Sequence, residues 1–396
     1  MAFAPLAGFH VLDLTSSLAG PTCTQILGAL GADIVKVEHP QRGDEARAWG
    51  PRFFEGGSVM FFAANTSKRS LALDVKSPEG KEALLRLVDR SDVFVQSLRP
   101  GTAERLGLGY EALHARNGRL VYCSIGAFGR RGPLTAQPGY DPLMQAFTGI
   151  VSITGERDRP GVRVGTSLID LGTGVWAALG VLAALHERAE TGRGREVDVA
   201  LFETGLSLVG YQLTDALRTG LAPARFGTAF PLIAPYEVFP TSDGELMIAA
   251  ANDRLFAQLC AGIDRPELAE DPRFKTPQAR WDNRAEFDAI LGAWTGARSK
   301  HEVMKLMGDA GVPCGATLDT GEVLADPHLK AREMIVDIDY PTRGTYQTVG
   351  CPVKLSDSPV SITRPPMLGE HTGDLLGALC GVAPGDVKRL RDKGVV

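Results

Sequence analysis

The sequence has little cysteine and no closely spaced cysteine pair. Its six cysteines lie far apart, without a CxxC motif, at Cys23, Cys123, Cys260, Cys314, Cys351 and Cys380. Zinc-binding domains need closely spaced ligands and small disulfide-rich domains need many cysteines, so the spacing favours neither. The seven histidines are also scattered without a close pair. We therefore predict no metal site.

The chain also lacks a large excess of charge of one sign. Its formal net charge is -5 over 396 residues. Proteins that bind nucleic acid usually carry a strongly basic surface, so we expect no nucleic-acid partner. No basic segment precedes an apolar run near the start of the sequence, and the most apolar stretch, residues 171–185, is too short to cross a bilayer. We expect a cytoplasmic protein without a membrane partner.

Several motifs that bind nucleotides or mark hydrolases are missing. The turn after the first predicted strand reads SSLAGP over residues 16–21, where a dinucleotide site would have GxGxxG. Those glycines let the backbone approach a pyrophosphate, so their absence disfavours a nicotinamide or flavin oxidoreductase. A P-loop, a GxSxG motif and an HExxH motif are absent as well.

Strand and helix patterns alternate through the first 200 residues. Short apolar strands are predicted at residues 10–14, 32–37, 70–75, 93–96, 120–124 and 196–200. A helix that begins near Pro21 and ends near Gly31 joins the first two strands, and a second helix follows Ser77 as its N-cap over residues 78–89. Strand–helix–strand units of this kind predict an α/β fold with a Rossmann-like, doubly wound parallel sheet.

The pattern changes near residue 206. A hairpin is predicted from residues 235–239 and 245–250, followed by helices at 254–260, 283–294 and 300–310. Further strands are predicted at 313–318, 334–338 and 351–355. We predict a large α/β domain over residues 1–205 completed by residues 330–396, a linker over 206–224, and a smaller α+β domain over 225–325.

A single carboxylate stands at the start of a long apolar helix. Asp170 precedes an apolar run that continues to about Leu185, and Gly172 and Gly174 fall in the first turn. Unpaired N–H groups and the helix dipole would keep a carboxylate ionised there, while small neighbours leave room for a second molecule. This arrangement suits an exposed, ionised nucleophile. Asp is also a preferred N-cap residue, so the segment alone leaves a capping role open.

Short motifs along the whole chain resemble the class III CoA-transferases, the family of formyl-CoA transferase and carnitine CoA-transferase. The motifs are residues 11–15, 19–21, 30–38, 68–70, 76–80, 99–101, 106–110, 191–194 and 369–372. The resemblance implies an acyl-CoA site at the carboxyl edge of the sheet and a homodimer of two interlocked chains. It implies that Asp170 attacks the thioester, giving a mixed anhydride and then an aspartyl-CoA thioester. CoA would enter as a thioester substrate with a small carboxylic acid as acceptor, and no tightly bound cofactor is expected.

The resemblance also implies a set of CoA-binding positions. These positions are Leu18, Ala19, His39, Leu73, Ser97, Leu98, Arg105 and Tyr140. Ala19 and Arg105 match formyl-CoA transferase, whereas Leu18, His39, Ser97 and Leu98 differ from it, which argues against formyl and oxalyl specificity. Leu18 in the core and Arg105 in a helix-surface ion pair remain alternatives. Arg47, Arg52 and Arg163 are candidates for binding the second carboxylate of a succinyl-CoA-like donor.

An α-methylacyl-CoA racemase or epimerase is the main alternative, because these enzymes share the implied fold. They use a His–Asp pair ahead of the aspartate that matches Asp170. Tyr140 stands at the position of that histidine, beside Asp141. An unperturbed tyrosine has a pKa of about 10 and is a poor base at neutral pH, so a transferase is favoured. A non-catalytic acyl-CoA-binding protein is the third possibility.

Overall fold

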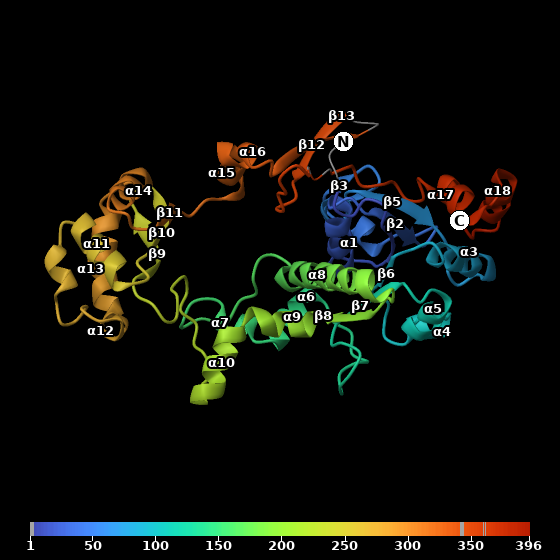
Figure 1. Ribbon diagram of the computed structural model, residues 1–396. Helices are drawn as coiled ribbons and strands as arrows, with labels where there is room; N and C mark the ends of the chain where they lie inside the picture. The colour runs from blue at the N-terminus through green and yellow to red at the C-terminus, as the bar shows by residue number, and fades with distance from the viewer. Residues whose placement is uncertain (1–3, 341–343, 359, 361) are drawn as a thin grey trace. The chain divides into compact units, whose positions relative to one another are not determined.

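The computed structural model describes residues 4–340, 344–358, 360 and 362–396, and the chain forms two compact units (Figure 1). The larger unit comprises Met1–Ile150, Val164–Leu213 and Lys330–Val396, and the smaller unit comprises Val151–Arg163 and Thr214–Leu329. The larger unit has the α/β fold that the sequence predicts.

A six-stranded parallel sheet in the order β5-β2-β1-β6-β7-β8 forms the centre of the larger unit. Its strands are β1 (His10–Leu14), β2 (Asp33–Glu38), β5 (Lys68–Ala72), β6 (Val93–Gln96), β7 (Val121–Gly126) and β8 (Glu196–Ala200). The chain proceeds from β1 through β2 to β5 on one side and from β6 through β7 to β8 on the other. Strand order therefore reverses between β1 and β6, which is where doubly wound sheets bind their ligands.

Helices surround this sheet and the C-terminal segment completes its core. The helices of the larger unit are α1 (Ala19–Ala29), α2 (Val59–Ala64), α3 (Pro78–Val88), α4 (Thr102–Leu106), α5 (Tyr110–Arg116), α6 (Asp141–Phe147), α8 (Leu168–Thr191), α9 (Leu201–Leu208), α17 (Thr372–Cys380) and α18 (Pro384–Asp392). Short elements are the 3-10 turn η1 (Glu45–Ala48) and strands β3 (Phe53–Phe54) and β4 (Gly57–Ser58). Leu375 and Leu376 of α17 pack into the same buried cluster as Leu84 of α3. As predicted, Ser77 caps α3.

Helix α8 continues beyond the predicted end near Leu185. It spans 24 residues and ends at Thr191, and its C-cap residue, Gly192, has a φ of 69°. The polar last turns stay helical because Arg188 is buried and pairs with Asp92. By length and composition α8 could cross a membrane, but here it packs against α1, β7 and β8.

The smaller unit contains the predicted hairpin and helices. Strands β9 (Tyr236–Thr241), β10 (Gly244–Ala249) and β11 (Cys314–Ala316) form an antiparallel sheet. Its helical elements are α7 (Ile150–Ile153), α11 (Asp253–Gly262), η2 (Pro266–Ala269), α12 (Pro277–Asp282), α13 (Arg284–Gly296), α14 (Lys300–Asp309) and α15 (Thr320–Ala325). Phe256, Phe274 and Phe287 pack together in its core. Residues 206–224, expected as a linker, carry helix α10 (Gly210–Thr219).

One predicted strand is wrong. After α16 (Pro327–Ala331), strand β12 (Ile335–Tyr340) pairs with β13 (Gly344–Val349), and not with residues 351–355. Residues in β13 alternate in exposure and include the strand formers Thr345, Tyr346 and Thr348. Among the residues that the structure describes, the segment 351–355 takes part in an isolated bridge, between Leu355 and Ser358.

Candidate active site

The sheet brings most of the predicted CoA-binding positions to one edge. Leu73 follows β5, His39 follows β2, Leu18 lies in the turn after β1, and Ser97 and Leu98 follow β6. Because parallel strands all end at the same edge, these residues lie along the edge that contains the point where strand order reverses. The turns after β1 and β6 also touch directly there.

The contact between these two turns is a hydrogen bond: the backbone N–H of Ser16 donates to Oγ of Ser97 over 3.1 Å. A cavity of about 230 Å³ lies nearby, lined by residues that include Leu98, Ser124 and Arg130. The carboxyl edge of the sheet therefore has both a turn fixed by a hydrogen bond and a cavity beside it.

The remaining predicted positions have different surroundings. Leu18 and Leu73 are buried, and Ala19 is the first residue of α1. Arg105 and Tyr140 do not directly follow a strand, and both are exposed. The Arg105 guanidinium donates to Oγ1 of Thr102 over 2.7 Å, and among the residues described it forms no ion pair. The ion-pair interpretation of Arg105 is thus not supported.

Asp170 does not cap α8. The helix begins at Leu168 with Ser167 at the N-cap position, so Asp170 is its third residue. The side chain is half-buried. Within residues 4–340, 344–358, 360 and 362–396, no group donates a hydrogen bond or forms an ion pair to its carboxylate. This carboxylate is therefore available to another molecule.

Asp141 caps α8 instead. Its Oδ2 accepts hydrogen bonds from the backbone N–H groups of Ile169, at 2.7 Å, and Asp170, at 3.2 Å. Its Oδ1 accepts from Nε2 of Gln145 over 2.6 Å, and the side chain is fully enclosed. Both oxygens of Asp141 are thus engaged, whereas those of Asp170 are not. From the sequence, Asp141 is recognisable only as the carboxylate next to Tyr140. Its capping role could not be predicted, because 28 residues separate it from Ile169, whose N–H it binds.

The electrostatic surroundings of Asp170 differ from the expectation of a permanently ionised side chain. Burial, and then the charge of Asp141, raise the pKa of Asp170 from its ordinary 3.8 to about 7. The N–H groups that would have stabilised the ionised form already bond to Asp141. A substantial fraction of Asp170 is therefore protonated at neutral pH.

Gly174 brings the start of α8 close to the start of α1. A Cβ atom at Gly174 would lie 2.8 Å from the carbonyl oxygen of Ala19 and 2.7 Å from Cβ of Thr22. This glycine thus makes room for α1 and not, as expected, for a substrate. Asp170 is one helical turn earlier on the same side of α8, so it lies toward the turn that precedes α1.

The three arginines that are candidates for binding a second substrate carboxylate have different surroundings. Arg47 is buried, with its Nε 2.7 Å from Oε1 of Glu38, so its charge is already neutralised within the fold. Arg52 is exposed, and Arg163 belongs to the smaller unit. Arg47 is accordingly a wrong candidate for substrate recognition.

Comparison with known proteins identifies the class as a CoA-transferase, an enzyme that moves CoA from an acyl-CoA to a carboxylic acid. The sequence model of "CoA-transferase family III" matches residues 6–372. The chain belongs to this family, as its motifs indicate.

Relatives match along nearly their whole length. Succinyl-CoA–D-citramalate CoA-transferase of Chloroflexus aurantiacus is 36% identical over 99% of this chain and 98% of its own. Formyl-CoA:oxalate CoA-transferase of Streptomyces coelicolor is 36% identical over 100% of both chains. A crystal structure of a CAIB/BAIF family protein from Brucella suis has a TM-score of 0.84 and 38% identity, covering 95% of this chain and 99% of that one.

Proposed function

We propose that Asp170 is the nucleophile through which this CoA-transferase works. The observation that carries the proposal is the contrast between two neighbouring aspartates. Asp141 is enclosed and both of its oxygens are engaged, Oδ2 by the first turn of α8 and Oδ1 by Gln145, whereas the carboxylate of Asp170 has no partner among the described residues. A carboxylate nucleophile must keep an oxygen free to attack, and of these two aspartates Asp170 meets this requirement.

The proposed reaction has four displacements. A carboxylate oxygen of Asp170 attacks the thioester carbonyl and the carbon–sulfur bond breaks. CoA leaves as a thiolate, and the acyl group and Asp170 form a mixed anhydride. The thiolate attacks the aspartyl carbonyl, which releases the donor acid with one oxygen that belonged to Asp170 and leaves an aspartyl-CoA thioester. The acceptor carboxylate attacks the carbonyl carbon of this thioester, the carbon–sulfur bond breaks, and CoA thiolate leaves as a second mixed anhydride forms. The thiolate then takes the acceptor acyl group and restores Asp170.

We propose a succinyl-CoA-like dicarboxylyl thioester as the donor. Two 36% identical relatives carry different donors in their names, succinyl-CoA and formyl-CoA, so identity alone does not choose between them. The resemblance favours the first, because Leu18, His39, Ser97 and Leu98 depart from formyl-CoA transferase. Since Arg47 pairs with Glu38, the second carboxylate needs another partner, and Arg52 remains a candidate in the larger unit.

We also propose that the chain works as a homodimer in the cytoplasm. Large apolar side chains on one side of α8 are exposed, among them Val175, Trp176 and Leu179 at 55%, 48% and 53%. A second copy that covers this face would remove it from water. All six cysteines are unbonded, as expected in a reducing compartment. Light scattering of the purified protein tests the dimer.

Trapping of the acylated enzyme tests the nucleophile. The protein is incubated with succinyl-CoA, treated with hydroxylamine or borohydride, digested with trypsin and analysed by mass spectrometry. Asp170 is the one aspartate in the tryptic peptide over residues 164–188, whereas Asp141 falls in a different peptide. We expect modification in the first peptide and none in the Asp170→Asn variant.

Formyl-CoA and oxalyl-CoA are the matched comparison donors in the same experiment. A stronger adduct with formyl-CoA than with succinyl-CoA would overturn the donor proposal and leave the nucleophile intact. Absence of any adduct with all donors, together with deuterium exchange at the substrate α-carbon, would overturn the nucleophile proposal.

A further inference from the structure

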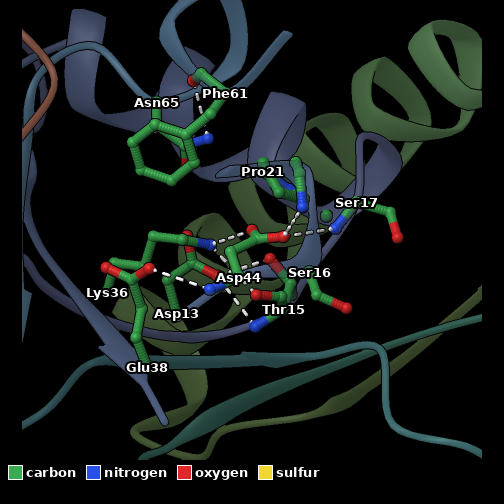
Figure 2. Close-up of polar contacts among 12 residues, drawn as sticks. Asp13, Thr15, Ser16, Ser17, Pro21, Lys36, Glu38, Asp44, Phe61 and Asn65 are labelled. Carbon is green, nitrogen blue, oxygen red and sulfur yellow. Dashed lines mark hydrogen bonds and ion pairs between the residues drawn. The ribbon is translucent and has the colours of Figure 1, made fainter. Parts of the chain in front are cut away.

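A buried network of charged side chains contacts the turn after β1 (Figure 2). Asp13 pairs with Lys68, with 3.1 Å between Oδ2 and Nζ, and Lys36 pairs with Asp44, with 2.8 Å between Nζ and Oδ2. All four side chains are almost completely enclosed. Burying two ion pairs is costly, so their placement calls for an explanation beyond stability.

Each pair also holds the backbone of the turn. Oδ1 of Asp13 accepts from the backbone N–H of Thr15 over 3.0 Å. Nζ of Lys36 donates to the carbonyl oxygen of Thr15 over 3.0 Å, and Oδ1 of Asp44 accepts from the N–H of Ser17 over 3.0 Å. Together with the bond from Ser16 to Ser97, these contacts engage the N–H of every residue from 15 to 17.

Ser17 shows that the turn has an unusual conformation. Its φ is 69°, in the left-handed region that residues other than glycine seldom adopt. Such a conformation persists where surrounding contacts fix it. Here the contacts are the bond from the Ser17 N–H to Asp44 and a bond from its hydroxyl to Glu45.

We propose that Lys36 and Asp44 are positioning residues that hold the turn over residues 15–18 in the conformation that receives the CoA thioester. The turn lies at the carboxyl edge where strand order reverses and leads into α1, against which the start of α8 packs. Lys36 is the link in this arrangement, since one ammonium group binds both the Thr15 carbonyl and the carboxylate that holds Ser17. The inference rests on the proposed acyl-CoA site at this edge.

A pair of variants separates positioning from stability. Lys36→Met leaves the Asp44 carboxylate buried without its cation, so a lower melting temperature is expected. The double variant K36M/D44N removes both charges, and the amide that replaces the Asp44 carboxylate keeps an oxygen for the Ser17 N–H. Its melting temperature should recover toward that of the wild type, while the Thr15 carbonyl stays unheld.

The readout is the dissociation constant for CoA, measured by titration calorimetry on the full chain. We expect K36M/D44N to bind CoA about 10- to 100-fold more weakly despite its recovered stability, because a misplaced binding group loses contacts. The control is Arg188→Met, which removes a buried cation that pairs with Asp92 before β6, at the opposite edge of the sheet. That variant should melt earlier and bind CoA as the wild type does.

Two results would overturn the inference: wild-type CoA affinity in K36M/D44N, or an equal loss of affinity in Arg188→Met. Failure of the nucleophile proposal gives a different pattern. In that case the wild type shows no adduct at Asp170, and the difference in CoA affinity between the variants persists.

Discussion

Two carboxylates of the larger unit, Asp13 and Asp170, have pKa values shifted in opposite directions by their surroundings. Burial by itself would raise the pKa of Asp13, but Lys68 and Lys36 outweigh it and lower the pKa to about 2. Burial and Asp141 raise the pKa of Asp170 to about 7, and no cation within the described part of the chain compensates. The neutralised carboxylate contributes to structure, whereas the uncompensated one is the residue that we propose as the nucleophile. Replacing each of them tests this comparison.

The largest effect is expected from Asp170→Asn. Without a nucleophilic carboxylate, CoA transfer should fall by about 1,000-fold or more. Initial rates with succinyl-CoA and a range of carboxylic acid acceptors measure the loss. CoA affinity should change little, since the amide has nearly the same shape. An active Asp170→Asn enzyme would exclude Asp170 as nucleophile.

Asp13→Asn should reduce the stability of the fold, with no specific effect on the catalytic reaction. Because the folded-state pKa lies below the ordinary 3.8, ionised Asp13 stabilises the fold above that pH, and this contribution disappears as the pH falls toward 2. The substitution also leaves Lys68 buried without its carboxylate. We expect a loss of about 3–5 kcal/mol in the free energy of unfolding at pH 7, measured by denaturant titration. An unchanged stability would show that the network is not needed for folding.

Asp170→Asn should have the opposite effect on stability. Because the folded-state pKa is raised, ionising Asp170 costs stability as the pH rises from 3.8 to about 7, and the full cost is present above pH 7. The variant should therefore be more stable than the wild type, and its advantage should grow by about 2 kcal/mol between pH 5 and pH 8. Thermal unfolding at both pH values measures this gain. A pH-independent difference would contradict the assigned pKa.

The smallest effect concerns the pH dependence of acylation. Only the ionised form of Asp170 attacks, so the rate of adduct formation should rise by about tenfold from pH 6 to pH 8 with a midpoint near pH 7. Single-turnover trapping at saturating acyl-CoA measures this rate. A flat profile over this range would indicate that bound substrate holds Asp170 ionised throughout.

The sequence predicts the local features well. It places β1, β6 and β8, the Ser77 cap and the hairpin of the smaller unit. These features depend on neighbouring residues, such as the period of apolar positions or a capping side chain.

Features that depend on distant residues could not be predicted in the same way. Asp141 caps a helix that begins 27 positions later, and Lys36 reaches back to Thr15. Residues 351–355 have a strand-like pattern, but β12 pairs with β13, the segment that lies between β12 and these residues in the sequence. Which groups pair in each case depends on the tertiary fold, and short sequence motifs do not specify these pairings.

The most direct test of the account follows oxygen from the acceptor acid into Asp170. In the proposed reaction, an acceptor carboxylate labelled with oxygen-18 leaves one of its oxygens on the aspartate each time the enzyme is restored. After turnover with unlabelled acyl-CoA, tryptic peptide 164–188 should contain heavy oxygen at Asp170, while the peptide with Asp141 should not. Rapid turnover without label in peptide 164–188 would show that CoA passes directly between the acids, and would contradict the role assigned to Asp170.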